Sequence, residues 1–196
     1  MDIHQPTTLL GGLSPTQFMR RHWQKKPLLV RQASPGVVPP ITRSALFDLA
    51  GADGVESRLL TAFDSGWALR HGPFSRRMLP PVKKPNWTLL VQGLDLHWQP
   101  AHTMLQAFRF VPEARLDDLM LSYASDGGGV GPHIDSYDVF LLQVHGRRRW
   151  RIGPVVDRSL QPDLPVRILA NFQPTEEWLL EPGDMLYLPP LWGHDG

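Results

Sequence analysis

The sequence predicts a mainly β fold with short helical elements in its N-terminal half. From residue 116 onward, short apolar or alternating runs are separated by glycine, proline and aspartate, as in sandwiches and barrels. The 196 residues include 20 prolines, about twice the usual share of ~5%, which favours turns over long helices. No internal repeat and no long linker divides the chain, so we expect one domain.

The composition excludes several functional classes. Lys and Arg number 20 against 19 Asp and Glu, so no strong overall field recruits nucleic acid or an anionic membrane. No apolar run approaches the ~18 residues of a membrane span, and the N-terminus carries an acid where a signal peptide carries basic residues. We therefore expect a cytoplasmic protein with no membrane or DNA partner. Without cysteine, any metal must bind His, Asp or Glu.

The first helix is predicted by its N-terminal signals. Ser14 can cap it, Pro15 suits the first helical position, and Gln17 completes a capping box. Pro27 ends the helical segment ahead of a short apolar run. A strand is expected directly after that proline.

The remaining helices and strands are predicted from the periodicity of apolar residues and from the glycines and prolines that interrupt it. A second short helix is expected near residues 43–50, and strands are expected within residues 57–72 with a turn inside residues 66–74. Residues 86–98 are compatible with strand or helix, whereas residues 100–111 are predicted to be helical. The C-terminal strands are expected within residues 116–125, 137–144, 147–153 and 184–190.

Two histidines and an aspartate form a candidate metal site. His133 and Asp135 follow a glycine-rich segment and would leave the same face of a strand. His194 follows a Pro182–Gly183 turn signal near the chain end, and a barrel can return it beside the first pair. This donor set is the 2-His-1-carboxylate arrangement of non-haem Fe(II) oxygenases. A His-x-Asp pair also occurs by chance as two surface residues.

Arg148 is the candidate anion-binding residue. On a strand it shares a face with Trp150 and Ile152, so it is expected to point inward. A buried guanidinium requires a partner, and a planar carboxylate suits it best. The arginines at positions 147, 149 and 151 fall on the opposite face, where solvation or a basic surface patch is the simpler interpretation.

An ordered series of segments resembles a known family. The chain is similar to the bacterial JmjC-type ribosomal oxygenases of the cupin superfamily, in particular the arginine hydroxylases of the sixteenth large-subunit ribosomal protein. The resemblance spans nearly the whole chain. Its segments are FMRRHWQKKPLLVRQA (18–33), SRLL (57–60), WALRHGPF (67–74), NWTLLVQ (86–92), the glycine-rich centre at 117–153 and EPGDMLYLPPLWGH (181–194).

The resemblance implies a double-stranded β-helix, a jelly-roll of the cupin and JmjC type, that uses Fe(II), 2-oxoglutarate and O2. It implies that His133, Asp135 and His194 bind the metal and that Arg148 binds 2-oxoglutarate. A protein arginine hydroxylase with a large-subunit ribosomal protein as substrate is the function implied. Two alternatives remain open, a non-catalytic metal-bound cupin that serves as a binding or assembly module and a small-molecule cupin oxygenase.

The resemblance also implies a substrate pocket formed by Asp118, Met120 and Tyr137. Asp118 and Met120 are two residues apart and would share the face of a strand. A carboxylate for a guanidinium and an apolar wall for its methylene groups are what an arginine pocket requires.

The whole chain, residues 1–196, is expected to be one JmjC-type oxygenase domain. Its N-terminal cover would span about residues 1–115 and its β-helix core about residues 116–196. Because a jelly-roll needs a strand after its distal histidine, we expect the chain to continue with a closing strand. The resemblance adds C-terminal domains, with a homodimer formed through regions beyond residue 196.

Overall fold

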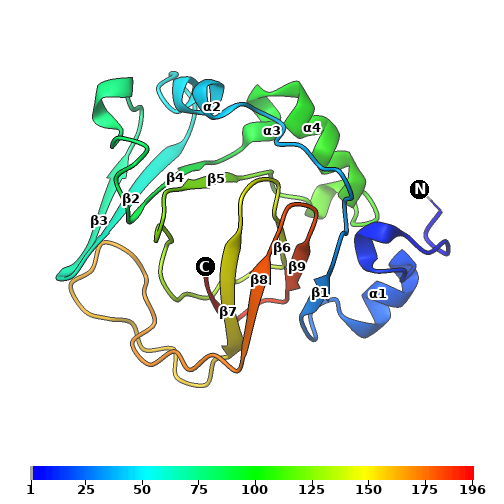
Figure 1. The fold of residues 1–196 in the computed structure, drawn as a ribbon. Helices are drawn as coiled ribbons and strands as arrows, with labels where there is room; N and C mark the ends of the chain where they lie inside the picture. Colours follow the sequence, from blue (N-terminus) through cyan, green and yellow to red (C-terminus); the bar gives the residue numbers. More distant parts are fainter. Residues whose placement is uncertain (1) are drawn as a thin grey trace. The chain divides into compact units, whose positions relative to one another are not determined.

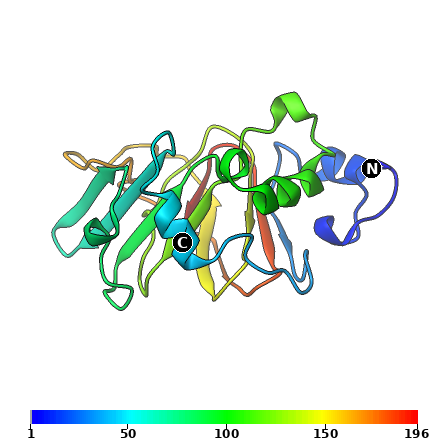
Figure 2. The same cartoon turned by 90° about the horizontal axis from the view of Figure 1, so that it is seen from above.

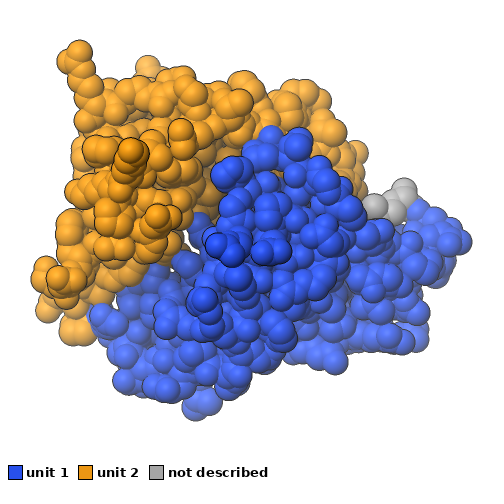
Figure 3. All heavy atoms as spheres, in the orientation of Figure 1, with its two compact units in different colours: residues 1–39, 131–161, 168–196 blue, residues 40–130, 162–167 orange. Residues whose placement is uncertain are grey.

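The computed structural model describes residues 2–196 and divides into two compact units, coloured separately in Figure 3. Unit 1 comprises residues 1–39, 131–161 and 168–196, and unit 2 comprises residues 40–130 and 162–167. Strands dominate and the helices are short, so the mainly β prediction is confirmed. The predicted division near residue 115 stays a prediction. No helix in residues 2–196 combines the length and apolarity needed to cross a membrane.

Unit 1 contains two three-stranded antiparallel sheets, ordered β1-β9-β6 and β10-β7-β8 (Figure 1). Its elements are η1 (Thr8–Leu10), α1 (Pro15–Arg21), β1 (Leu28–Val30), β6 (Val139–Leu142), β7 (Arg148–Pro154), β8 (Glu176–Leu180), β9 (Met185–Leu188) and β10 (Trp192–Asp195). Apolar side chains from both sheets form one core cluster: Trp150, Ile152, Leu180, Leu186 and Leu188.

Helix α1 begins as the sequence predicts. Ser14 Oγ accepts from the Gln17 backbone N–H at 3.2 Å, and the Gln17 side chain accepts from Ser14 N at 2.9 Å. The buried Phe18 of this helix packs edge-on against Tyr187, with ring centroids 4.8 Å apart. The apolar face of α1 is thereby fixed to β9.

Unit 2 is a four-stranded antiparallel sheet, ordered β3-β2-β4-β5, with helices packed against it (Figures 1 and 2). Its elements are α2 (Arg43–Leu49), β2 (Ser57–Phe63), β3 (Gly66–His71), η2 (Arg76–Met78), β4 (Trp87–Val91), α3 (Leu94–His97), α4 (Gln99–Leu105), η3 (Gln106–Phe108), η4 (Glu113–Arg115) and β5 (Leu121–Ala124). The helix near residues 43–50 is confirmed, whereas the segment predicted as a helix at residues 100–111 is helical only as far as Phe108. The ambiguous segment 86–98 contains a strand and then a helix, separated at Gly93, whose φ is 59°.

The turn expected inside residues 66–74 lies earlier. Phe63 pairs with Gly66, so the β2–β3 hairpin turns at residues 64–65. Gly66 has a φ of 138°, a conformation that glycine adopts at little cost. The glycine therefore ends the turn and begins β3.

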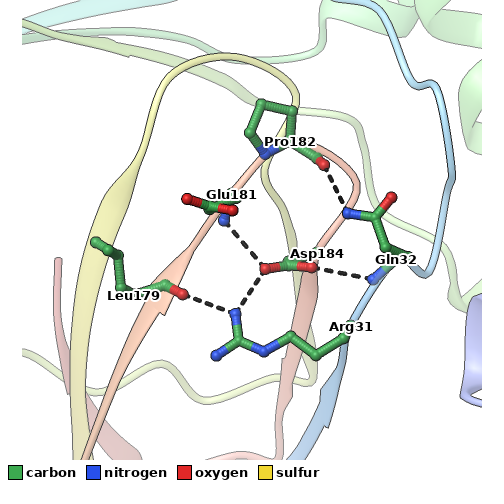
Figure 4. Close-up of polar contacts among 6 residues, drawn as sticks. All are labelled: Arg31, Gln32, Leu179, Glu181, Pro182 and Asp184. Atoms are coloured by element: carbon green, nitrogen blue, oxygen red, sulfur yellow. Dashed lines mark hydrogen bonds and ion pairs between the residues drawn. The ribbon is translucent and has the colours of Figure 1, made fainter.

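A buried carboxylate joins the two residues that follow β1 to the turn between β8 and β9 (Figure 4). The turn that Pro182–Gly183 signals in the sequence has the type II form, because Asp184 N donates to Glu181 O at 2.9 Å and Gly183 has a φ of 97°. The Asp184 carboxylate is 4% exposed and accepts from Arg31 Nη1 at 2.6 Å, Gln32 N at 3.0 Å and Glu181 N at 3.1 Å. The Asp184 carboxylate is therefore the hydrogen-bond acceptor for three N–H groups.

Asp184→Asn is expected to lower the free energy of unfolding by about 2–3 kcal/mol, because an amide cannot accept all three bonds as an anion does. Burial alone would raise the pKa of Asp184, but the Gln32, Glu181 and Arg31 donors hold it below its usual value. This stabilisation is present above the unfolded pKa of about 3.9 and is lost as the pH falls through the folded pKa. Denaturant unfolding between neutral and acidic pH measures the difference, with the exposed Asp53→Asn as control. Equal stability of the two variants at neutral pH would contradict the assignment.

Candidate functional site

The structure brings together the three residues predicted to bind metal. One ligand atom each from His133, Asp135 and His194 lies within 4.8 Å of the others. His194 Nε2 is 3.4 Å from Asp135 Oδ2, and the two imidazole centroids are 4.1 Å apart. These residues converge although nearly sixty residues separate them in the chain.

The expected strand for His133 and Asp135 is absent. The two residues lie in an irregular segment between β5 and β6, because the preceding turns hold glycines with positive φ, 70° at Gly127 and 76° at Gly131. One isolated bridge takes the place of the strand. His133 N donates to His194 O at 2.9 Å, and His194 N donates to His133 O at 3.0 Å. This bridge brings the two histidines together without a regular ladder.

Backbone carbonyls orient both imidazoles. His133 Nδ1 lies 2.8 Å from Gly131 O, and His194 Nδ1 lies 3.0 Å from Trp192 O. A carbonyl can only accept, so each Nδ1 carries a proton, and in the neutral form of each ring the lone pair is on Nε2. Metal-binding histidines are commonly held in this way. Sequence inspection could not find these partners because they are main-chain atoms.

Burial favours the neutral form of His133, which is the form that can bind a metal. Desolvation, with a contribution from the neighbouring His194, lowers the pKa of His133 and so favours its neutral imidazole. The His194 side chain is 3% exposed, whereas Asp135 is 22% exposed. Two imidazole nitrogens and one carboxylate fit a divalent first-row metal such as Fe(II).

Arg148 occupies the predicted inner face of β7. Trp150 and Ile152 on that face are buried, and the Arg148 guanidinium lies 5.6 Å from the Trp150 ring centroid. Arg149 and Arg151, on the other face, are exposed and pair with acidic residues. The predicted alternation of inner and outer residues along β7 is confirmed. Burial lowers the pKa of Arg148.

The residues predicted to bind substrate are distributed over both units. Asp118 and Met120 belong to unit 2 and Tyr137 to unit 1. The expectation that Asp118 and Met120 share a strand face is wrong, because β5 begins only at Leu121. Met120 and Tyr137 are exposed, as a substrate contact requires. Asp118 is partly buried, and desolvation raises its pKa.

Sequence reasoning missed Gln92, which binds the Asp118 carboxylate. Gln92 Nε2 donates to Asp118 Oδ2 at 2.8 Å, and Gly93 N donates to the same oxygen at 2.6 Å. The available signal was a glutamine placed between a buried strand and a glycine turn. That signal alone does not identify its partner.

Comparison with known proteins shows what the segment that carries this site is similar to. Residues 103–196 match the family model described as JmjC domain. The chain is 41% identical over 183 residues to the "Ribosomal protein uL16 3-hydroxylase" of Escherichia coli K12, covering 91% of this chain and 48% of that protein. It therefore spans about half the length of this curated relative.

Solved structures of ribosomal oxygenases are similar to this chain. An X-ray structure of E. coli YcfD superposes with a TM-score of 0.84 at 40% identity, covering 92% of this chain and 48% of that one. YcfD, a ribosomal oxygenase from the same organism, in complex with cobalt and 2-oxoglutarate gives a TM-score of 0.81 at 39% identity, covering 93% and 47%. The chain thus has the JmjC-type cupin fold that the sequence predicts, and its residues 103–196 match the JmjC domain.

Proposed function

We propose that the protein is an Fe(II)- and 2-oxoglutarate-dependent dioxygenase that hydroxylates an arginine side chain of a large-subunit ribosomal protein. The observation that carries the proposal is the convergence of His133, Asp135 and His194 within 4.8 Å. The uL16 hydroxylase relative and the cobalt and 2-oxoglutarate complex of YcfD support the substrate class and the cosubstrate.

The triad would hold Fe(II) through His133 Nε2, a carboxylate oxygen of Asp135 and His194 Nε2. When bound, Fe(II) with 2-oxoglutarate and O2 supplies an oxidation that yields succinate and CO2 and inserts one oxygen atom into a C–H bond. The Gly131 and Trp192 carbonyls keep both rings in the ligand tautomer. Three protein ligands leave coordination positions open for the cosubstrate and O2.

Arg148 would bind the distal carboxylate of 2-oxoglutarate. Its side chain lies on the inner face of β7 beside the apolar residues of that strand. A guanidinium in such surroundings forms a strong, planar pair with a carboxylate.

Arg148→Ala is expected to raise the 2-oxoglutarate concentration needed for turnover by about ten- to a hundredfold, because a charge-assisted pair is worth roughly 1.5–3 kcal/mol. Metal affinity should change little, because Arg148 is not a ligand. Succinate formation against 2-oxoglutarate concentration measures the first effect, and Co(II) titration measures the second. Arg149→Ala, on the exposed face, is the matched control. A large effect in the control and none in Arg148→Ala would reverse the face assignment.

The substrate arginine would be held by Asp118 through charge, and by Met120 and Tyr137 through contact with its methylene groups. A cytoplasmic location fits a ribosomal substrate. The homodimer stays a prediction.

The proposal is tested by succinate release from 2-oxoglutarate in the full-length protein, with and without an arginine-containing ribosomal peptide. Succinate that rises with the arginine peptide, and not with its lysine counterpart, is the expected result. Peptide binding without succinate would indicate a non-catalytic module. Turnover stimulated by small metabolites alone would indicate a small-molecule oxygenase.

A further inference from the structure

The segment that carries Asp118 has no regular structure and is fixed by the first residues of α3. Leu94 N donates to Leu119 O at 2.9 Å, and Leu119 N donates to Asp95 Oδ1 at 2.8 Å. The backbone next to Asp118 is therefore attached to the start of α3 through both the N–H and the C=O of Leu119. These bonds fix where the carboxylate is placed, but they do not fix its rotation.

The rotation is fixed by two donors on one oxygen. Gln92 Nε2 at 2.8 Å and Gly93 N at 2.6 Å both bind Asp118 Oδ2. Within residues 2–196, no hydrogen bond reaches Asp118 Oδ1. The second oxygen thus keeps its acceptor capacity for a cation from outside the chain.

Arg58 orients the Gln92 amide. Arg58 Nη2 donates to Gln92 Oε1 at 3.0 Å and lies 3.8 Å from Met120 Sδ. A guanidinium has only donors, so the amide oxygen must face Arg58 and the NH2 group must face Asp118. The neutral amide also separates the Arg58 charge from the carboxylate. A direct ion pair between Arg58 and Asp118 would occupy the group that a substrate guanidinium needs.

We propose that Gln92, oriented by Arg58, is a positioning residue that turns Asp118 so that its Oδ1 receives the guanidinium of the substrate arginine. This inference rests on the proposed function, because it requires that Asp118 binds an arginine. Gln92 acts only through Asp118 and contacts no reacting atom. It therefore affects substrate binding more than the chemical step.

The test is Gln92→Leu in the full-length protein, with Gln92→Met as a second variant because methionine keeps the unbranched shape of glutamine. The KM for the arginine peptide should rise about tenfold, with a smaller change in kcat, as expected for the loss of one hydrogen bond to a charged group. Gln106→Leu is the matched control. It makes the same substitution in unit 2 at a side chain that pairs with His102, and it should leave both constants unchanged.

A second measurement is independent of turnover. The carboxyl pKa of Asp118, followed by NMR of ¹³C-labelled aspartate, should rise in both Gln92 variants, because they remove a donor that stabilises the ionised form. The control should keep the wild-type value. An unchanged KM, an unchanged Asp118 pKa, or a fall in kcat as large as the rise in KM would overturn the inference. Wild-type protein without arginine-dependent succinate would instead overturn the proposed function on which the inference rests.

Discussion

Asp135→Ala is expected to abolish 2-oxoglutarate turnover. The substitution removes the anionic ligand and leaves two neutral imidazoles for a divalent ion. Loss of groups that merely support a metal ligand costs about 10–100-fold in affinity or activity, so loss of the ligand itself should exceed that range. Succinate formation measures activity, and Co(II) titration measures metal affinity.

The matched control for Asp135 is Asp157→Ala. Asp157 lies in the same unit but on an exposed loop, where its carboxylate accepts from Ser159 and Asn171. Its removal should leave turnover unchanged. Full turnover by Asp135→Ala would refute the metal-ligand assignment.

Asp118→Ala is expected to remove arginine hydroxylation almost completely, while uncoupled turnover of 2-oxoglutarate falls much less. The carboxylate supplies the charge that a guanidinium requires, and Asp118 is not among the residues that converge on the candidate metal site. Hydroxylated peptide and succinate, measured in the same reaction, give the ratio of coupled to uncoupled turnover.

Asp117→Ala provides the comparison, because its carboxylate is adjacent in sequence and exposed. This control should keep the wild-type ratio. If Asp118→Ala loses both activities equally, Asp118 supports the fold through its bonds to Gln92 and Gly93 rather than the substrate.

The features predicted correctly from the sequence were those set by local chemistry. The capping box of α1 needs only Ser14, Gln17 and their spacing, and the inner face of β7 follows from the alternation of Arg148 with Trp150 and Ile152. The residue types and spacing of the triad also indicated metal chemistry. Its convergence could be expected only from the return of a distant strand.

The predictions that were wrong concern features that depend on contacts between distant segments. Glycines with positive φ turn the chain ahead of His133, so a single bridge to His194 replaces the strand assumed for it. Bonds from residues 93–95 hold the segment of Asp118 outside β5. The Arg58–Gln92–Asp118 chain joins three segments whose proximity no local pattern encodes.

The proposed function requires that this chain forms the oxidising site of an arginine hydroxylase. The most direct measurement is the mass of an arginine-containing ribosomal peptide after incubation with the full-length protein, Fe(II), 2-oxoglutarate and O2. A gain of one oxygen atom on the arginine residue, absent in Asp135→Ala, is the predicted result. An unmodified peptide from protein shown to bind both metal and 2-oxoglutarate would contradict it.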